Sequence, residues 1–267
     1  MRPDLAEALK PFREDPAGSV LLFDLDGTLS PIVPHPRQSR VSSRIRSLLR
    51  GLCESYGKVG VISGRPARET QSLVGVEGAV YVGQHGMEEI EGERLRREAP
   101  ARTVSPAIAH LFRTWSSNRQ VQDTGLYLEN KGIALAVHYR RAAPGGEELA
   151  RRLVSQALLA YPQLSMQEGK KVLELKPGET DKGTAVYRLL SGRGFARALY
   201  AGDDLTDIHA FQSLERLAGE GGLIEVLTLA VGGEELHPEV AQAARITLSG
   251  PEELEETLAY LAGQDHP

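Results

Sequence analysis

The sequence predicts an α/β protein in which an open parallel sheet, covered by helices on both faces, is interrupted by a smaller inserted α+β unit. Short apolar runs alternate with stretches of helical periodicity at both ends of the chain, which is the pattern of buried parallel strands joined by helices. In the middle, residues 133–139 alternate between apolar and polar or small side chains, as in a sheet with one open face. Hydrophobic residues make up 41% of the chain and charged residues 25%, so a sizeable buried core is expected.

The strands of the core sheet are expected where the apolar runs are shortest and least interrupted. Helical spacing of leucine and isoleucine predicts the helices between them, and Pro66 is tolerated in the first turn of one. Strands that alternate with helices imply parallel pairing through right-handed crossovers. The predicted strands are residues 19–23, 59–62, 79–82, 198–201, 223–231 and 245–248, and the main predicted helices are 42–56, 205–218, 251–261 and one that begins at Pro66.

The inserted unit is predicted from a helix, two strands, a second helix and two further strands between residues 101 and 176. We therefore expect a discontinuous core of residues 1–100 and 179–267, with residues 101–178 forming a separate domain. Strands with one polar face are typical of an antiparallel α+β module.

Composition excludes several classes of protein. The 31 Lys and Arg residues against 36 Asp and Glu residues give a net charge of -5, which argues against a nucleic-acid partner. The single cysteine, Cys53, excludes an intrachain disulfide and fits a reducing compartment. The first residues lack the apolar stretch of a signal peptide, and no apolar run is long enough to span a bilayer. We expect a cytoplasmic protein with no membrane partner.

The strongest chemical signal is the run from Asp24 to Thr28, DLDGT, directly after the first apolar strand. Open α/β sheets bind ligands at the carboxyl ends of their strands, and Asp24 and Asp26 can converge there. Two adjacent carboxylates repel each other unless a cation lies between them, and hard divalent cations prefer carboxylate and carbonyl oxygen. A bare pair of aspartates is more often an Asp-rich turn, but the preceding strand and the following Gly-Thr make this motif more specific.

A second acidic cluster, GDDLTD, ends another predicted strand. Asp203 and Asp207 are four residues apart, so both lie on one face at the start of a helix. Acidic residues at a helix start are also ordinary capping groups. Together with Asp24 and Asp26, however, the cluster predicts a magnesium site.

Two further motifs are suited to holding phosphate. Ser63, Gly64 and Arg65 lie between a strand and a helix, where a hydroxyl and backbone N–H groups can hold an oxyanion. Lys182 begins a predicted helix and can place a positive charge on a phosphoryl group. Taken alone, the first motif is equally an ordinary helix entry and Lys182 an ordinary surface lysine.

The order of these motifs resembles the haloacid dehalogenase superfamily of phosphatases. More narrowly, DLDGTLSPI from Asp24, SGR from Ser63, GQHG from Gly83, HYR from His138 and GDDLTD from Gly202 resemble the trehalose-6-phosphate phosphatase family. The resemblance implies a haloacid dehalogenase-like, Rossmann-type core with an inserted cap domain. Two positions depart from the family pattern: Gln84, where a small residue is expected, and Ile208-His209, where acidic residues are more usual.

The same resemblance implies roles for the core residues. Asp24 would be the nucleophile that forms an aspartyl-phosphate, and Asp26 would protonate the departing sugar oxygen and later activate water. Mg²⁺ would be held by the Asp24 carboxylate, the Asp26 carbonyl and Asp203, with Asp207 supporting them. The phosphoryl oxygens would be bound by Ser63 and Lys182, with Arg65 as a further phosphate contact or an anchor.

In the inserted unit, residues 168–176 carry alternating acidic and basic side chains. Glu168, Lys170 and Glu174 share strand parity, so we expect them on one face if no bulge intervenes. The resemblance implies that these three contact the sugar, and Lys131, His138 and Arg140 are expected on the same face. A solvated face with cross-strand ion pairs is an equally good interpretation of Lys131, His138 and Arg140.

The sequence therefore predicts a phosphoric monoester hydrolase that depends on Mg²⁺ and converts trehalose 6-phosphate to trehalose and phosphate. The alternatives are another capped sugar phosphatase, acting on sucrose phosphate or a glycosyl-phosphoglycerate, a phosphomutase, and a sugar-phosphate sensor without activity. The expected partner is a small sugar phosphate, supplied by a synthase on a separate chain.

Overall fold

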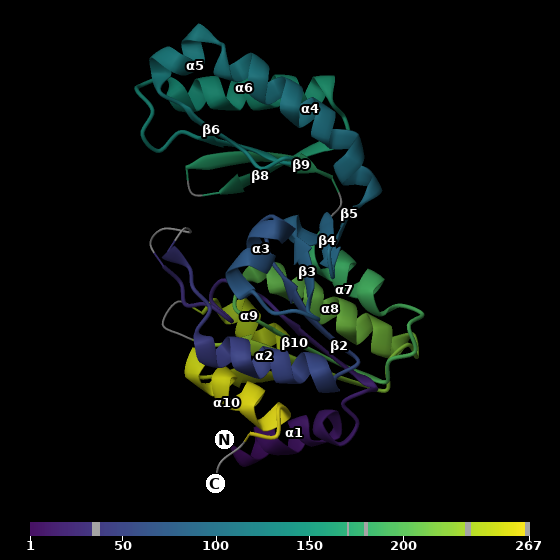
Figure 1. Ribbon diagram of the computed structural model, residues 1–267. Helices are drawn as coiled ribbons and strands as arrows, with labels where there is room; N and C mark the ends of the chain where they lie inside the picture. Colours follow the sequence, from purple (N-terminus) through teal and green to yellow (C-terminus); the bar gives the residue numbers. More distant parts are fainter. Residues whose placement is uncertain (34–37, 170, 179–180, 233–235, 265–267) are drawn as a thin grey trace. The chain divides into compact units, whose positions relative to one another are not determined.

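The computed structural model describes residues 1–33, 38–169, 171–178, 181–232 and 236–264. The chain forms two compact units (Figure 1). The first, which we call the core unit, combines Met1–Arg96 with Thr180–Pro267, and the second, the inserted unit, is Arg97–Glu179.

The core unit contains an eight-stranded sheet in the order β12-β11-β10-β1-β2-β3-β4-β5. The strands from β12 to β3 are parallel, and β4 turns back antiparallel to β3. The bounds are β1 (Ser19–Phe23), β2 (Lys58–Ile62), β3 (Val80–Gly83), β4 (Glu88–Glu91), β5 (Arg94–Arg97), β10 (Arg197–Gly202), β11 (Glu225–Val231) and β12 (Ile246–Leu248).

The predicted parallel α/β sheet is confirmed, whereas β4 and β5 were not predicted. Their sequences, EEIE and RLRR, are dominated by charges and carry no apolar run. Strand β5 is at the edge of the sheet, where one side is not paired and such composition is common, and β4 lies between β3 and β5. Short, charged strands of this kind leave no hydrophobic pattern to detect.

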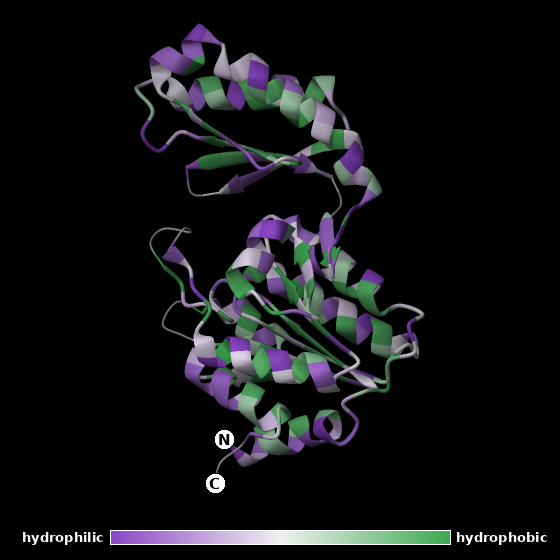
Figure 2. Ribbon diagram, viewed as in Figure 1, coloured by the Kyte–Doolittle hydropathy of each residue, from purple (hydrophilic) through white to green (hydrophobic). Residues whose placement is uncertain are grey.

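Helices cover both faces of this sheet because its central strands are apolar on both sides. In β1, Leu21 and Phe23 pack into one apolar cluster and Val20 and Leu22 into the other. Figure 2 shows these strands as hydrophobic and the helices as amphipathic. The first cluster includes residues of α1 (Pro3–Glu14), α2 (Ser43–Ser55), α3 (Ala67–Val74) and α10 (Pro251–Leu261), and the second includes residues of α7 (Lys182–Leu190), α8 (Leu205–Gly219) and α9 (Pro238–Ala243).

The inserted unit is a four-stranded antiparallel sheet in the order β6-β7-β9-β8, with helices packed on one face. Leu135, Val137, Leu173 and Leu175 are fully buried on that face, so the alternate residues lie on the other, which we call the open face. The elements are α4 (Ala99–Ser116), α5 (Arg119–Thr124), β6 (Tyr127–Asn130), β7 (Leu135–His138), α6 (Gly146–Ala160), β8 (Leu164–Gly169) and β9 (Val172–Pro177).

None of the helices within the described ranges has both the length and the apolar character that a bilayer span requires.

The core sheet brings three polar positions to one edge. Its strand order changes direction at β1, which pairs with β2 on one side and β10 on the other. Asp24, Ser63 and Asp203 follow β1, β2 and β10 respectively. Parallel strands end at the same edge, and the point where the order reverses is where ligands bind in open α/β sheets.

Candidate active site

A buried lysine joins the two acidic motifs. Lys182, 3% exposed, donates hydrogen bonds to Asp24 Oδ1 at 2.6 Å and to Asp207 Oδ1 at 2.7 Å. Burial works to lower the pKa of Lys182, but the carboxylates of Asp24 and Asp207 outweigh it and raise that pKa. Lys182 is therefore a protonated cation inside the site, and the surface interpretation of this residue is wrong.

Asp207 organises the start of α8. Its Oδ2 accepts backbone N–H bonds from Asp203 at 3.2 Å and Asp204 at 3.0 Å, within a capping box formed with Asp204. Its Oδ1 also accepts the Tyr200 hydroxyl at 2.6 Å. Asp207 is fully buried with both oxygens engaged, so its main effect is to hold Lys182 and the Asp203 backbone in place.

Asp203 lies against the DLDGT turn. Its Oδ1 accepts the Thr28 hydroxyl at 3.1 Å, so the last residue of the turn is tied to Asp203. Gly27 has φ +94°, and a Cβ there would stand 2.0 Å from Asp203 Oδ2. Only a residue without a side chain allows the turn to approach the carboxylate this closely.

Carboxylate oxygens of Asp24, Asp203 and Asp207 all lie within 4.8 Å of one another. Burial raises the pKa of Asp24 well above its usual range, Lys182 lowers it, and the carboxylates of Asp207 and Asp203 raise it further. Burial, followed by Asp207, raises the pKa of Asp203 to about 6. Buried carboxylates gathered around a single lysine favour a divalent cation, because it would offset their mutual repulsion. The donor set fits a metal ion.

Asp26 is held by a different set of residues. Arg65 grips its carboxylate in a fork, with Nε 2.6 Å from Oδ2 and Nη2 2.8 Å from Oδ1. The buried Ser39 donates to Asp26 Oδ1 at 2.9 Å. Arg65 also bonds Glu69 one helical turn on, so its guanidinium bridges the two acidic residues.

The Ser63 loop is tied to a strained turn after β3. Ser63 Oγ accepts the Arg65 N–H at 3.1 Å, while the N–H groups of Gln84 and His85 donate to the carbonyls of Arg65 and Ser63 at 2.8 and 3.1 Å. Gln84 and His85 have φ of 50° and 54°, a left-handed conformation that non-glycine residues seldom adopt. The His85 ring lies against Gly64, where a Cβ would be 2.8 Å from Nε2. The backbone bonds of this turn and the His85 ring thus hold the Ser63 loop in place.

On the open face of the inserted sheet, three of the predicted sugar-contacting residues, Lys131, Glu174 and His138, have hydrogen-bonding partners. Lys131 lies 3.2 Å from Glu174, and His138 Nε2 lies 3.1 Å from Glu129. The Tyr127 and His138 rings are 5.4 Å apart, so an aromatic surface flanks the charges. Sequence reasoning missed Glu129 and Tyr127, although their alternation along β6 places both on the His138 side.

The expectation that Glu168 and Glu174 share a face is wrong. A hairpin separates them: Gly169 pairs with Val172, Glu168 with Leu173, and Glu174 with Gln167. Cross-strand partners share a face, so Glu168 lies on the helical side, where it bonds Arg151 of α6 at 2.5 and 3.2 Å.

Two other predicted contacts of this unit are placed differently. Lys170 lies outside the described residues. Arg140 is exposed and follows β7 by two residues.

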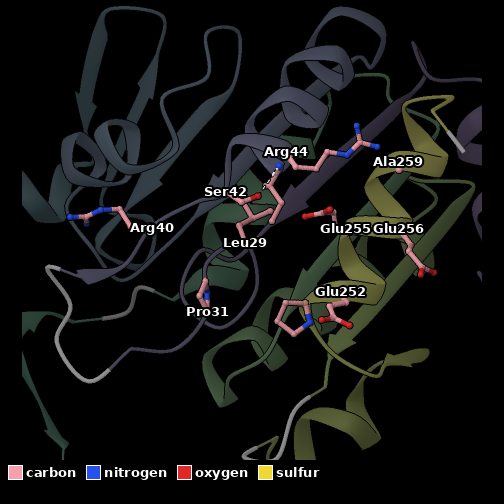
Figure 3. A pocket seen from close by; sticks show the side chains of 11 residues that line it. Leu29, Pro31, Arg40, Ser42, Arg44, Glu252, Glu255, Glu256 and Ala259 are labelled. Atoms are coloured by element: carbon pink, nitrogen blue, oxygen red, sulfur yellow. Dashed lines mark hydrogen bonds between the residues drawn. The ribbon is translucent and has the colours of Figure 1, made fainter. Parts of the chain in front are cut away.

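A cavity of about 730 Å³ opens elsewhere in the core unit, between the segment after the DLDGT turn, the start of α2, and α10 (Figure 3). Among the residues described along its wall, none is a predicted site residue. The wall is formed by Leu29, Pro31, Arg40, Ser42, Arg44, Ile45, Pro251, Glu252, Glu255, Glu256 and Ala259.

Comparison with known proteins finds relatives that are similar in sequence and in fold. The trehalose-phosphatase family profile matches residues 22–239. Trehalose-6-phosphate phosphatase of Escherichia coli strain K12 is 36% identical over 204 residues, which cover 74% of each chain. Trehalose-phosphate phosphatase B of Arabidopsis thaliana is 32% identical over 223 residues, covering 77% of this chain and 59% of the relative.

Solved structures agree in fold. The C. albicans trehalose-6-phosphate phosphatase C-terminal domain matches with TM-score 0.72 and 25% identity over 98% of both chains. A haloacid dehalogenase-like hydrolase from Bacteroides thetaiotaomicron matches with TM-score 0.61 at 17% identity, over 91% of this chain and 99% of that one. The predicted haloacid dehalogenase-like core is confirmed.

The chain spans 59% to 62% of the length of two rice relatives and the Arabidopsis relative. The family profile nevertheless covers most of the chain, from within β1 to within α9, and includes Asp24, Ser63, Lys182 and Asp203. This chain belongs to the trehalose-phosphatase family.

Proposed function

We propose that this protein is a Mg²⁺-dependent phosphatase that hydrolyses trehalose 6-phosphate to trehalose and inorganic phosphate. The observation that carries the proposal is the buried Lys182, bonded to both Asp24 and Asp207, in a member of the trehalose-phosphatase family. A buried cation between carboxylates at a sheet's switch point suits phosphoryl transfer, because that reaction needs positive charge around a carboxylate nucleophile.

The metal would be held by the carboxylates of Asp24 and Asp203 and by the backbone carbonyl of Asp26, with Asp207 in support. When bound, Mg²⁺ would neutralise negative charge on the transferring phosphoryl group. Oxygen ligands in this number suit Mg²⁺, which keeps several water molecules and uses few protein groups. Thr28 orients Asp203 for this role.

Asp24 acts as the nucleophile in this proposal. Its Oδ1 is held by Lys182, so the carboxylate is fixed while Oδ2 attacks phosphorus. The new bond joins Asp24 to phosphorus as the bond from phosphorus to the sugar oxygen breaks. Splitting hydrolysis into two displacements lets one carboxylate do chemistry that water does slowly.

Asp26 moves the proton in both displacements. It gives its proton to the departing sugar oxygen, which leaves as a neutral hydroxyl. Its carboxylate then takes a proton from water, which attacks phosphorus, breaks the bond to Asp24 and releases inorganic phosphate. The Arg65 fork occupies both Asp26 oxygens, so Arg65 must withdraw from one of them before Asp26 can donate.

The phosphoryl oxygens are bound by Ser63 and Lys182. The ammonium group of Lys182 carries three protons, two of which point to Asp24 and Asp207, and the third is available to phosphate. An Arg65 released from Asp26 supplies a second positive charge beside Ser63. The strained turn at Gln84 and His85 keeps the Ser63 loop in one conformation.

We assign sugar recognition to the open face of the inserted sheet. Glu174, Lys131, His138 and Glu129 supply donors and acceptors for hydroxyl groups, and Tyr127 offers an aromatic surface. Lys170 and Arg140 remain predicted contacts. Glu168 also remains a prediction, and its position on the helical side weakens the case for it.

The test is phosphate release by the purified protein with Mg²⁺ from a panel of trehalose 6-phosphate, sucrose 6-phosphate, a glucosyl-phosphoglycerate and glucose 6-phosphate. We expect the highest kcat/KM for trehalose 6-phosphate. A preference for a phosphoglycerate ester would refute the assignment of trehalose 6-phosphate as the substrate. Isomerised sugar phosphate without net phosphate release would identify a mutase. Tight binding without turnover would identify a sensor. A cytoplasmic location and a separate synthase chain stay predictions.

A further inference from the structure

Two buried serines form a hydrogen-bonded chain that ends on Asp26. Ser39 Oγ lies 2.9 Å from Asp26 Oδ1 and 2.7 Å from Ser30 Oγ, and both serines are 0% exposed. A hydroxyl has one proton, and an ionised carboxylate only accepts. Ser39 must therefore donate to Asp26, which requires Ser30 to donate to Ser39.

The far end of this chain is anchored in the backbone. Ser30 Oγ accepts the Arg40 N–H at 3.1 Å, so the hydroxyl groups of both serines have a donor and an acceptor as partners. The Ser30 backbone closes the DLDGT turn as well, since its N–H donates to the Leu25 carbonyl and its carbonyl accepts from the Gly27 N–H. The series of hydrogen bonds therefore runs from the closed DLDGT turn, through Ser30 and Ser39, to the side chain of Asp26.

We propose that Ser39 is a positioning residue for the acid-base chemistry of Asp26, an inference that rests on the proposed phosphatase function. The Ser39 hydroxyl donates to Oδ1, so the catalytic proton is carried on Oδ2. Oδ2 is also the oxygen that Arg65 Nε holds at 2.6 Å and would release when its guanidinium turns to phosphate. Ser39 thus keeps the carboxyl group oriented while Arg65 moves.

The neighbours of the two serines serve a different surface. Leu29, Pro31 and Arg40 line the cavity beside α10 (Figure 3), whereas Ser30 and Ser39 are fully buried and are not part of its wall. A change of either hydroxyl therefore acts on Asp26 and leaves the cavity wall as it is.

The experiment compares two leaving groups. A sugar oxygen must be protonated as it departs, whereas p-nitrophenolate is a stable anion and needs little help from an acid. For Ser39→Ala we expect kcat on trehalose 6-phosphate to fall about 10- to 100-fold with KM nearly unchanged, because a misplaced acid acts only in the transition state. For p-nitrophenyl phosphate we expect the burst of p-nitrophenolate in the first turnover to slow less than about threefold, because Asp26 acts on this substrate only as the base of the second displacement.

Ser42→Ala is the matched control. Ser42 caps α2 by accepting the Ile45 N–H at 3.0 Å, and it does not contact Asp26 among the bonds described. Its loss should lower the melting temperature and leave the ratio of the two activities as in the wild type. Ser30→Ala, which removes the second link only, should shift the ratio in the same direction as Ser39→Ala but less, and it remains informative if Ser39→Ala does not fold.

The outcomes separate this inference from the proposed function. A loss in the rate of the p-nitrophenolate burst as large as the loss in kcat on the sugar phosphate, or no loss on the sugar phosphate, would overturn the role of Ser39. A wild-type protein that hydrolyses neither substrate would refute the phosphatase and the inference together. A wild type active on another sugar phosphate would refute only the choice of trehalose 6-phosphate, and that ester then replaces it in the comparison.

Discussion

The backbone of Gly27 lies directly against the carboxylate of Asp203, so the first acidic motif leaves space for the second only because residue 27 has no side chain. A Cβ at this position would meet Asp203 Oδ2 at 2.0 Å and Oδ1 at 2.5 Å. The glycine of DLDGT thus has a physical reason in this fold: it permits both the φ of +94° and the close approach of the Asp203 carboxylate.

Gly27→Ala should abolish most Mg²⁺ binding, because the methyl group displaces Asp203 and the positive φ is strained. We expect the Mg²⁺-dependent rise in melting temperature to disappear. Gly51→Ala is the control: Gly51 lies inside α2, nothing stands within 4 Å of its added Cβ, and the change should stabilise the fold by about 0.5–1 kcal/mol. Full Mg²⁺ binding by Gly27→Ala would contradict the role of this contact.

Lys182→Met should strongly destabilise the metal-free protein. Removing the cation leaves Asp24 and Asp207 buried without compensation, and breaking a buried pair in this way costs about 3–5 kcal/mol. Urea unfolding measures the loss. Lys171→Met removes an exposed lysine 3.9 Å from Glu147 and should change stability by less than about 1 kcal/mol. Similar effects of the two variants would show that Lys182 is not the centre of the acidic cluster.

Asp24→Asn should abolish phosphate release while the protein stays folded, since an amide oxygen cannot form the aspartyl-phosphate. A phosphate assay tests the loss of activity, and circular dichroism tests whether the variant stays folded. Asp123→Asn, in an exposed pair with Arg119 on α5, is the matched control and should retain activity. Wild-type turnover by Asp24→Asn would refute the proposal that Asp24 is the nucleophile.

The stabilising effect of Mg²⁺ should grow as the pH rises from about 5 to about 7, because the ion competes with a proton on Asp203. Burial raises the pKa of Asp203 from 3.8 to about 6, so the folded protein binds this proton more tightly than the unfolded chain does. The stability that this proton contributes is complete below pH 3.8 and is lost as the pH rises through about 6.

Melting curves with and without Mg²⁺ at the two pH values test this expectation. We predict a larger shift in melting temperature at neutral pH, and a smaller pH-dependent gain in Asp203→Asn, in which only Asp24 still exchanges a proton for the ion. An equal shift at both pH values would contradict the assignment of Asp203 as a metal ligand.

Glu174→Ala should raise KM for trehalose 6-phosphate about tenfold or more and leave p-nitrophenyl phosphate hydrolysis unchanged, because a lost contact with a sugar hydroxyl weakens only substrate binding. Glu168→Ala should affect both substrates little, since Glu168 faces Arg151 on the helical side. If instead Glu168→Ala has the larger effect, the open face is not the recognition surface.

Much of the site was predictable because the core strands are apolar runs that end in polar residues. Asp24, Ser63 and Asp203 each follow such a run, and neighbouring parallel strands bring them to one edge. Lys182 was found by its position at a helix start, although its burial was not evident from a sequence of mostly polar neighbours.

Contacts between distant side chains were not predictable. The Arg65 fork on Asp26 joins residues 39 apart, and Ser39 carries no pattern that distinguishes it from other loop serines. The error at Glu168 has a local cause: parity holds only along one strand, and the hairpin after Gly169 moves the next strand to the opposite phase.

The split of the core unit around the insert also determines when the acidic site can exist during synthesis. Strand β1 emerges first but has β10 as a neighbour, and Asp24 is 158 residues from Lys182, so the insert must leave the ribosome before the site can close. The inserted sheet uses nearby segments only, and local contacts form faster than distant ones. The nascent chain therefore carries β1 with its β10 side unpaired until late in translation, and an unpaired strand edge of this kind is prone to aggregation.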